Sequence, residues 1–266
     1  MNSGMREYAR SGRERVTGWL ARVDAEVIRS VLEAQAAKGL GGGLVEIGVH
    51  HDKSLILMAL GLAAGEKALC IDLFSLQDHN LDCSGKGDLE QFQSNLQRFG
   101  VPGDRVVIRE QSSLDLTPAQ VLEAVGPVRF FSVDGGHWLE AAKSDLALAE
   151  ATLAPHGVIA LDDFHRPEWP EVSAGLFAWL AERKRPVVPY LIGYNKLYLC
   201  EQEWVAHYQN AVLSDEFLRK FVVKRSKFMG VEVPVLSAFP LPEYNTKARL
   251  TFMLRSFAPD LFAKLK

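Results

Sequence analysis

The alternation of short β-rich runs with helical segments between Leu44 and Glu201 is the feature that most constrains the fold of this chain. Strands that alternate with helices form a mostly parallel sheet covered by helices. Several runs are almost continuously apolar, as expected for strands buried on both faces. The seven expected strands are Leu44–Val49, Ala68–Leu73, Arg105–Arg109, Val128–Val133, Val158–Leu161, Val187–Ile192 and Lys196–Cys200.

The last two runs define how the sheet ends. Only Gly193, Tyr194 and Asn195 separate them, which is too short a link for a crossover helix, so the two strands form an antiparallel hairpin. A nicotinamide-binding Rossmann domain would continue with another parallel unit instead. The sequence therefore predicts a Rossmann-like α/β fold, with a mostly parallel seven-stranded sheet that ends in an antiparallel hairpin.

Amphipathic patterns predict helices over residues 14–38, 87–99, 138–154 and 171–183. We expect an N-terminal helical extension (1–43), a core (44–201) and a C-terminal helical extension packed on the core (202–266). The C-terminal extension contains two helical stretches, a short apolar segment (VEVPVLSAF) and a final amphipathic stretch. That last stretch most simply docks on its own domain, although a dimerisation helix or a membrane-surface helix would show the same pattern. Its apolar stripe consists of Leu250, Met253, Leu254, Phe257 and Leu261.

Composition excludes several classes of function. Hydrophobic residues make up 48% and charged residues 24%, an ordinary globular composition. The net charge of −3 and the lack of a Lys/Arg cluster argue against a nucleic-acid partner. Cys70, Cys83 and Cys200 lie far apart with no CxxC pair, which suits a reducing compartment. No apolar run reaches membrane-spanning length and the first residues lack the apolar stretch of a signal peptide, so we expect a cytoplasmic protein.

The first expected strand ends in VEIGVHHDKS, residues 45–54, and this turn lies closest to the ligand in a doubly wound sheet. Glu46, Gly48 and Ser54 belong to it, and Gly48 would let the backbone approach a cofactor. The glycines are too few for the GxGxxG pattern. A phosphate-binding P-loop would need glycine in place of Asp52, whose carboxylate would repel phosphate.

An acidic residue, Asp72, ends the second expected strand. An acid about twenty positions after the first turn typically holds the ribose hydroxyls of an adenosine cofactor, with a helix cap or a solvated turn as the alternative. The third strand is followed by Gln111, Ser112 and Ser113, which could meet an adenine edge. Together these features favour S-adenosylmethionine, which has no pyrophosphate and needs no glycine-rich cradle.

Two acidic clusters follow the fourth and fifth expected strands. Asp134 begins DGGH, residues 134–137, and Asp162 and Asp163 begin DDFH, residues 162–165. Because both strands end at the same edge of the sheet, three carboxylates would converge there and repel one another unless a cation were bound. Oxygen ligands of this kind suit Mg²⁺. Asp134, Asp162 and Asp163 are therefore candidate metal ligands, with helix capping by the acidic pair as the alternative.

His137 is the candidate general base, because an imidazole with a pKa of about 6.5 can accept a hydroxyl proton at neutral pH. His165 is a second candidate, and His50 and His51 lie beside the expected cofactor turn. The long polar loop Ser75–Gly87 is a plausible lid over the site.

Five segments carry a family resemblance: VEIGVHHDKS, CIDLF, SGKGD, VDGGHWLEAAKSDL and APHGVIALDDFHRPEW. Together they resemble the class I methyltransferases of the methyltransferase domain 24 group, which is related to the macrocin and mycinamicin sugar O-methyltransferases. The resemblance spans roughly residues 16–200. In the sugar-modifying relatives, an Asp after the fourth strand and an acidic pair after the fifth hold Mg²⁺, which implies this role for Asp134, Asp162 and Asp163. A His three residues beyond the first Asp acts as the base in some relatives, which implies this role for His137. Asp52 departs from the group, which often has glycine there.

The sequence thus predicts an S-adenosylmethionine-dependent, Mg²⁺-dependent O-methyltransferase that acts on a hydroxyl of a sugar or glycosylated metabolite. His137 would take the hydroxyl proton while Mg²⁺ anchors the acceptor. The expected partners are a small-molecule or glycan acceptor and a second copy of the chain. A metal-dependent hydroxylase or hydrolase, or a non-catalytic adenosyl-binding protein, are the alternatives. The expected cofactor-binding residues are Glu46, Gly48, Ser54, Asp72, Ser112, Ser113 and Asp134.

Overall fold

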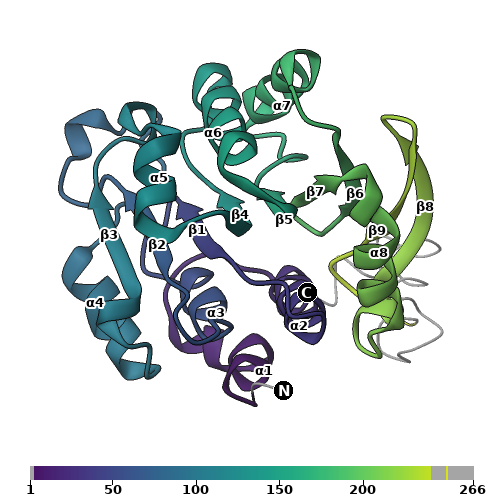
Figure 1. Cartoon of the computed structure of the whole chain (residues 1–266), viewed down its shortest axis with the longest axis horizontal. Coiled ribbons are helices and arrows are strands. Elements are labelled where there is room, and N and C mark those ends of the chain that lie inside the picture. The colour runs from purple at the N-terminus through teal and green to yellow at the C-terminus, as the bar shows by residue number, and fades with distance from the viewer. Residues whose placement is uncertain (1–2, 241–249, 251–266) are drawn as a thin grey trace.

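A single twisted sheet organises the chain in the computed structural model, which describes residues 3–240 and residue 250 (Figure 1). Within these residues the sheet has nine strands in the order β3-β2-β1-β4-β5-β7-β6-β9-β8. The strands are β1 (Gly43–Ile47), β2 (Ala68–Asp72), β3 (Val106–Glu110), β4 (Val128–Val133), β5 (Leu153–Leu161), β6 (Val187–Ile192), β7 (Leu197–Glu201), β8 (Val222–Phe228) and β9 (Val231–Leu236).

Strands β1 to β5 pair in parallel, and β7 pairs antiparallel with both β5 and β6. This arrangement confirms the predicted mostly parallel sheet with its antiparallel hairpin. The predicted count of seven strands is wrong, because β8 and β9 form a second hairpin that joins the sheet through Ile192 and Val235. Strand β8, with the sequence VVKRSKF, is an edge strand whose charged side chains face solvent. Edge strands commonly carry such charges, which hide them from a search for apolar runs.

Helices cover both faces of the sheet (Figure 1). They are α1 (Ser3–Arg10), α2 (Arg22–Ala37), α3 (Leu55–Ala59), α4 (Leu89–Arg98), α5 (Pro118–Val125), α6 (Leu139–Thr152), α7 (Pro170–Glu182) and α8 (Val205–Ser214). The predicted helices 87–99, 138–154 and 171–183 correspond to α4, α6 and α7. The helix predicted over residues 14–38 begins only at Arg22, because Gly18 adopts a φ of 129° that a helix cannot accommodate. The Lys53 ammonium donates a hydrogen bond to the Gly18 carbonyl and holds this break in place.

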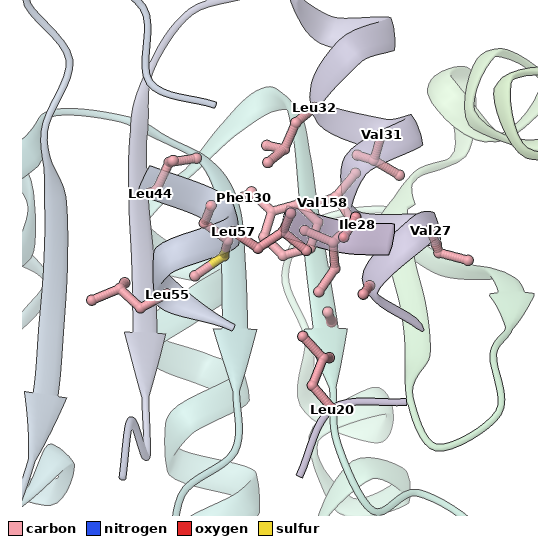
Figure 2. Packing of buried hydrophobic residues seen from close by; sticks show 14 of the residues in the cluster. Leu20, Val27, Ile28, Val31, Leu32, Leu44, Leu55, Leu57, Phe130 and Val158 are labelled. Carbon is pink, nitrogen blue, oxygen red and sulfur yellow. The ribbon is translucent and has the colours of Figure 1, made fainter. Parts of the chain in front are cut away.

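The core on the α2 side of the sheet follows directly from strand register. Leu44, Phe130 and Val158 occupy neighbouring positions on β1, β4 and β5 and point to the same face. Figure 2 shows Ile28 and Leu32 of α2 packed over this row. Burial of each such side chain stabilises the fold by about 1.5–3 kcal/mol. The next residue along each strand points to the opposite face and packs against α5, α6 and α7.

The segment after β7 differs from the predicted helical extension. Helix α8 is present, but the chain then forms a short 3-10 turn, Leu218–Phe221, and the β8–β9 hairpin. In the predicted final amphipathic stretch, Met253, Leu254, Phe257 and Leu261 lie outside the described residues. The expected domain limits stay a prediction. Within residues 3–240, no helix has both the length and the apolar character needed to cross a membrane.

Candidate active site

A cleft of about 550 Å³ opens at the edge of the sheet where β1, β2, β4 and β5 end. The turn after β1, the loop after β2 and the segment Thr17–Trp19 enclose it. The last of these reaches the cleft because the chain breaks at Gly18 rather than continuing as a helix. The cleft is lined by most of the predicted site residues, namely Gly48, Ser54, Asp72, Ser112, Ser113, Asp134, His137, Asp162 and Asp163.

Gly48 is required by the close approach of two strand ends. Its φ is 78°, and a Cβ at this position would lie 1.7 Å from the carbonyl oxygen of Asp134. Any other residue would push the β1 turn away from β4. Gly48 therefore brings the first turn and the Asp134 loop together at one end of the cleft.

Asp72 shapes the same turn from the end of β2. One carboxylate oxygen accepts hydrogen bonds from the backbone N–H groups of Val49 and His50, at 2.7 and 2.8 Å. The other accepts from the N–H of Phe74 at 2.8 Å. Asp72 thus fixes the turn of the predicted cofactor site, and its contact with a ribose stays a prediction.

The predicted serines lie at the starts of helical turns. Ser54 is buried and precedes α3. The Ser112 hydroxyl accepts a hydrogen bond from the Leu114 N–H, and Ser113 is the first residue of the 3-10 turn Ser113–Asp115. All three serines line the cleft, and Ser112 also caps the turn that follows it.

Glu46 lies beneath the cleft and does not line it. Its side chain is fully buried in β1, and this burial raises its pKa to about 7. The Ser54 hydroxyl and the Lys196 ammonium act in the opposite direction. Glu46 therefore sits one layer below the surface on which a ligand would rest, and its predicted cofactor contact stays a prediction.

His137 is held between two carboxylates. Its Nδ1 lies 2.8 Å from Asp82 Oδ2, and its Nε2 lies 3.1 Å from Asp163 Oδ2. The ring also stacks on Trp169, with the ring centroids 4.2 Å apart. Burial alone would lower the pKa of His137, but the hydrogen bonds to Asp163 and Asp82 outweigh it and raise the pKa above 6.5. The imidazole is therefore a stronger base than a free histidine.

Sequence reasoning missed Asp82, which comes from the predicted lid loop. Its Oδ2 accepts hydrogen bonds from both the backbone N–H and the ring of His137, each at 2.8 Å. Its Oδ1 accepts from the N–H and the hydroxyl of Ser84. These bonds outweigh the effect of burial and lower the pKa of Asp82. The polar character of the loop was the only signal, since Asp82 and His137 are 55 residues apart in the chain.

The acidic pair after β5 is engaged by the turn between β6 and β7. The Lys196 ammonium lies 2.6 Å from Asp162 Oδ2 and 3.7 Å from Asp134 Oδ2. The Asn195 amide donates to Asp162 Oδ1 at 2.5 Å and to Asp163 Oδ1 at 2.8 Å. Burial and the neighbouring Asp162 raise the pKa of Asp134 well above its ordinary value. Neither Asn195 nor Lys196 was predicted to belong to the site.

The three predicted metal ligands do not assemble as a set. Both oxygens of Asp162 already accept hydrogen bonds, from Lys196, from Asn195 and from the Asp163 N–H. Among the described residues, the ligating atoms that come within 4.8 Å of one another belong to Asp134, His137 and Asp163. The Lys196 ammonium thus lies beside Asp162, whereas Asp134, His137 and Asp163 form the group that could hold a metal ion. The metal role of Asp134, Asp162 and Asp163 stays a prediction.

The remaining histidines divide between the cleft and its surroundings. His50 and His51 line the cleft, and their rings lie 3.9 Å apart. The ring of Trp19, 76% exposed, lies 5.2 Å from that of His50 at the mouth of the cleft. His165 packs against Phe164 and is not among the residues that line the cleft. The structure thus favours His137 over His165 as the base.

Comparison with known proteins agrees with this geometry. Residues 45–164 match the model of a family described as a methyltransferase domain. The O-methyltransferase NovP has a similar structure, with 17% sequence identity, a TM-score of 0.57, and coverage of 66% of this chain and 78% of that one. The SAH-bound methyltransferase PaMTH1 of Podospora anserina gives 15% identity and a TM-score of 0.51, over 75% and 88% of the two chains. The calicheamicin methyltransferase CalS11 has 16% sequence identity and a TM-score of 0.50, and the match covers 66% of this chain and 76% of that one. At these identities the likeness establishes the fold. No curated protein sequence matches the chain significantly.

Proposed function

We propose that this chain, whose residues 45–164 match the model of a methyltransferase domain, transfers a methyl group from S-adenosylmethionine to a hydroxyl oxygen. The observation that carries the proposal is the position of His137. Its ring lies in the cleft at the carboxyl edge of the sheet, between Asp82 and Asp163. The family match favours this function over a hydroxylase, a hydrolase or a non-catalytic adenosyl-binding protein.

The cofactor has a site of suitable size and chemistry. The cleft volume of about 550 Å³ falls within the usual range for small-molecule sites. In the proposal, the adenosine lies between Asp72 and the Ser112–Ser113 turn, and the methionyl end lies at the turn after Gly48. This arrangement places the sulfonium near the ends of β1 and β4, toward His137. Glu46 and Ser54 support that turn, and Asp134 borders the transferred methyl group.

The proposed reaction uses His137 as a general base. Asp82 holds Nδ1–H, so Nε2 is the nitrogen that accepts a proton. The acceptor hydroxyl takes the place of Asp163 at Nε2 and passes its proton there. The oxygen forms a bond to the methyl carbon as the carbon–sulfur bond breaks, and S-adenosylhomocysteine leaves with the electron pair. Alignment of the two reactants in one cleft supplies much of the acceleration.

We assign the acceptor to sugars or sugar-bearing metabolites. The indole rings of Trp19, Trp138 and Trp169 line the cleft, and such rings offer apolar faces against which the C–H groups of a sugar pack. The Asp163 carboxylate and the Asn195 amide lie beside them to bind hydroxyls. One structurally similar protein is a calicheamicin methyltransferase, which supports a small-molecule acceptor. The cytoplasm is the proposed location, in line with three free cysteines.

The proposal uses no divalent cation, because Lys196 already provides the positive charge beside Asp162. Magnesium dependence therefore stays a prediction from the sequence, with no step of the reaction assigned to it.

Methyl-labelled S-adenosylmethionine and a panel of glycosides test the function directly. We expect label on an acceptor oxygen, and a loss of about 10²–10⁴-fold in turnover for His137→Ala, the usual contribution of a general base. His165→Ala is the matched control, because His165 is not among the residues that line the cleft. The proposal fails if the protein binds NAD in preference to S-adenosylmethionine, or if His137→Ala turns over at the wild-type rate.

A further inference from the structure

Lys196 stands out by its burial. It is 3% exposed and is the only fully buried lysine among residues 3–240 and 250. Lysine is almost never buried without a charged partner, because its ammonium loses its hydration. Here the ammonium forms ion pairs with the carboxylates of Asp162 and Asp134. The fold therefore places a cation inside the acidic cluster.

Strand pairing determines where this cation lies. Leu197 of β7 pairs antiparallel with Leu161 of β5, so the residue before Leu197 falls opposite the residue after Leu161. These two residues are Lys196 and Asp162. The turn is fixed from a second side, because the Asn195 N–H donates to a carboxylate oxygen of Asp24 in α2 at 2.9 Å. The fold therefore fixes Lys196 at the carboxyl ends of β4 and β5.

The ammonium engages two of the three carboxylates that were predicted to bind a metal. It lies 2.6 Å from Asp162 Oδ2 and 3.7 Å from Asp134 Oδ2. Mg²⁺ requires oxygen ligands at about 2.0–2.1 Å in near-octahedral order. Such an ion bound to these two carboxylates would also lie next to a fixed positive charge. The third predicted ligand, Asp163, is hydrogen-bonded to the His137 ring.

We propose that Lys196 is the built-in cation of this acidic cluster, in place of a divalent metal. Its ammonium neutralises Asp162 and Asp134 and keeps the ends of β4 and β5 together. Lys196 is a positioning residue, because it acts on the cleft through these two carboxylates. The proposal concerns the site assigned above to methyl transfer, and its metal-binding consequence can be measured without that activity.

Electron paramagnetic resonance of Mn²⁺ tests the proposal on the full chain, because the free aqueous ion gives a signal that disappears on binding. We expect the wild type to bind no Mn²⁺ at micromolar concentrations. Lys196→Met keeps the length of the side chain and frees both carboxylates, so it should bind one Mn²⁺ at least about tenfold more tightly than the wild type. Lys196→Arg restores the charge and should again exclude the ion. Lys143→Met is the matched control, since Lys143 pairs with Glu182 on the surface of α6.

Two results would overturn the proposal. One is stoichiometric Mn²⁺ binding by the wild type with a micromolar Kd, and the other is a folded Lys196→Met variant that binds no more Mn²⁺ than the wild type. If Lys196→Met does not fold, the wild-type titration still decides the matter. In the turnover assay, we expect wild-type methyl transfer to be unchanged by chelator. Absence of methyl transfer under every condition would refute the proposed function and leave the Mn²⁺ result standing.

Discussion

The clearest stability prediction concerns Asp52, in the turn after β1. Its side chain is fully buried, and neither carboxylate oxygen has a hydrogen-bond partner among the described residues. Its φ of 81° lies in the left-handed region, which disfavours residues other than glycine. Burial, with Glu46 and Asp72 nearby, raises the pKa of Asp52 from an ordinary 3.8 to about 10.

The raised pKa makes the stability of the protein fall as pH rises. Between pH 3.8 and about 10, the folded state holds a proton on Asp52 that the unfolded state has released. Over that window the free energy of unfolding decreases by about 1.4 kcal/mol per pH unit. The stability that the protonated Asp52 preserves is fully present below pH 3.8. By pH 7 the free energy of unfolding has fallen by about 4 kcal/mol through this residue. Asp52→Asn keeps the shape of the side chain but cannot ionise, so it should reduce the slope by about 1.4 kcal/mol per pH unit and leave the part due to Glu46.

Urea unfolding at pH 5, 6, 7 and 8, extrapolated linearly to water, measures the effect. Asp52→Gly should also remove the cost of the left-handed backbone, so we expect it to stabilise the protein at pH 7 by at least about 2 kcal/mol. The exposed Asp104→Asn is the control and should keep the wild-type slope. The reasoning is refuted if Asp52→Asn loses stability with pH as steeply as the wild type.

Four further predictions follow from the site. Gly48→Ala should unfold or severely destabilise the protein in thermal melts, because its Cβ would lie 1.7 Å from the backbone oxygen of Asp134, just after β4; a wild-type melting temperature would contradict this. Asp72→Ala should weaken S-adenosylmethionine binding at least about tenfold by calorimetry, and equal affinity would remove Asp72 from the cofactor site. The acidic limb of the pH–rate profile should have its midpoint above pH 6.5, because the pKa of His137 is raised. Asp82→Asn removes one cause of that rise and should move the midpoint to lower pH. An unmoved limb would mean that His137 is not the titrating group. Hydrogen exchange in the loop 75–87 should slow when cofactor and acceptor bind, and unchanged exchange would argue against a lid.

The sequence by itself determined the mostly parallel sheet, the β6–β7 hairpin and the edge at which the site lies. Apolar runs that alternate with helical patterns are local signals, and the rules of βα topology turn them into a global arrangement. The same rules placed Gly48, Asp72, Asp134 and the acidic pair after β5 at one edge, since the carboxyl ends of neighbouring parallel strands coincide there. All of these residues line the cleft, and the buried Glu46 lies beneath it.

The tertiary structure alone decided which groups meet inside that cleft. Asp82 reaches His137 across 55 residues from the loop after β2, and no local pattern encodes that contact. Lys196 reaches Asp162 only through the register between β5 and β7. In the sequence Lys196 is simply the first residue of an apolar strand. The partner of a charged side chain is set by packing between distant segments, so the sequence could indicate the acidic cluster but not the cation that neutralises it.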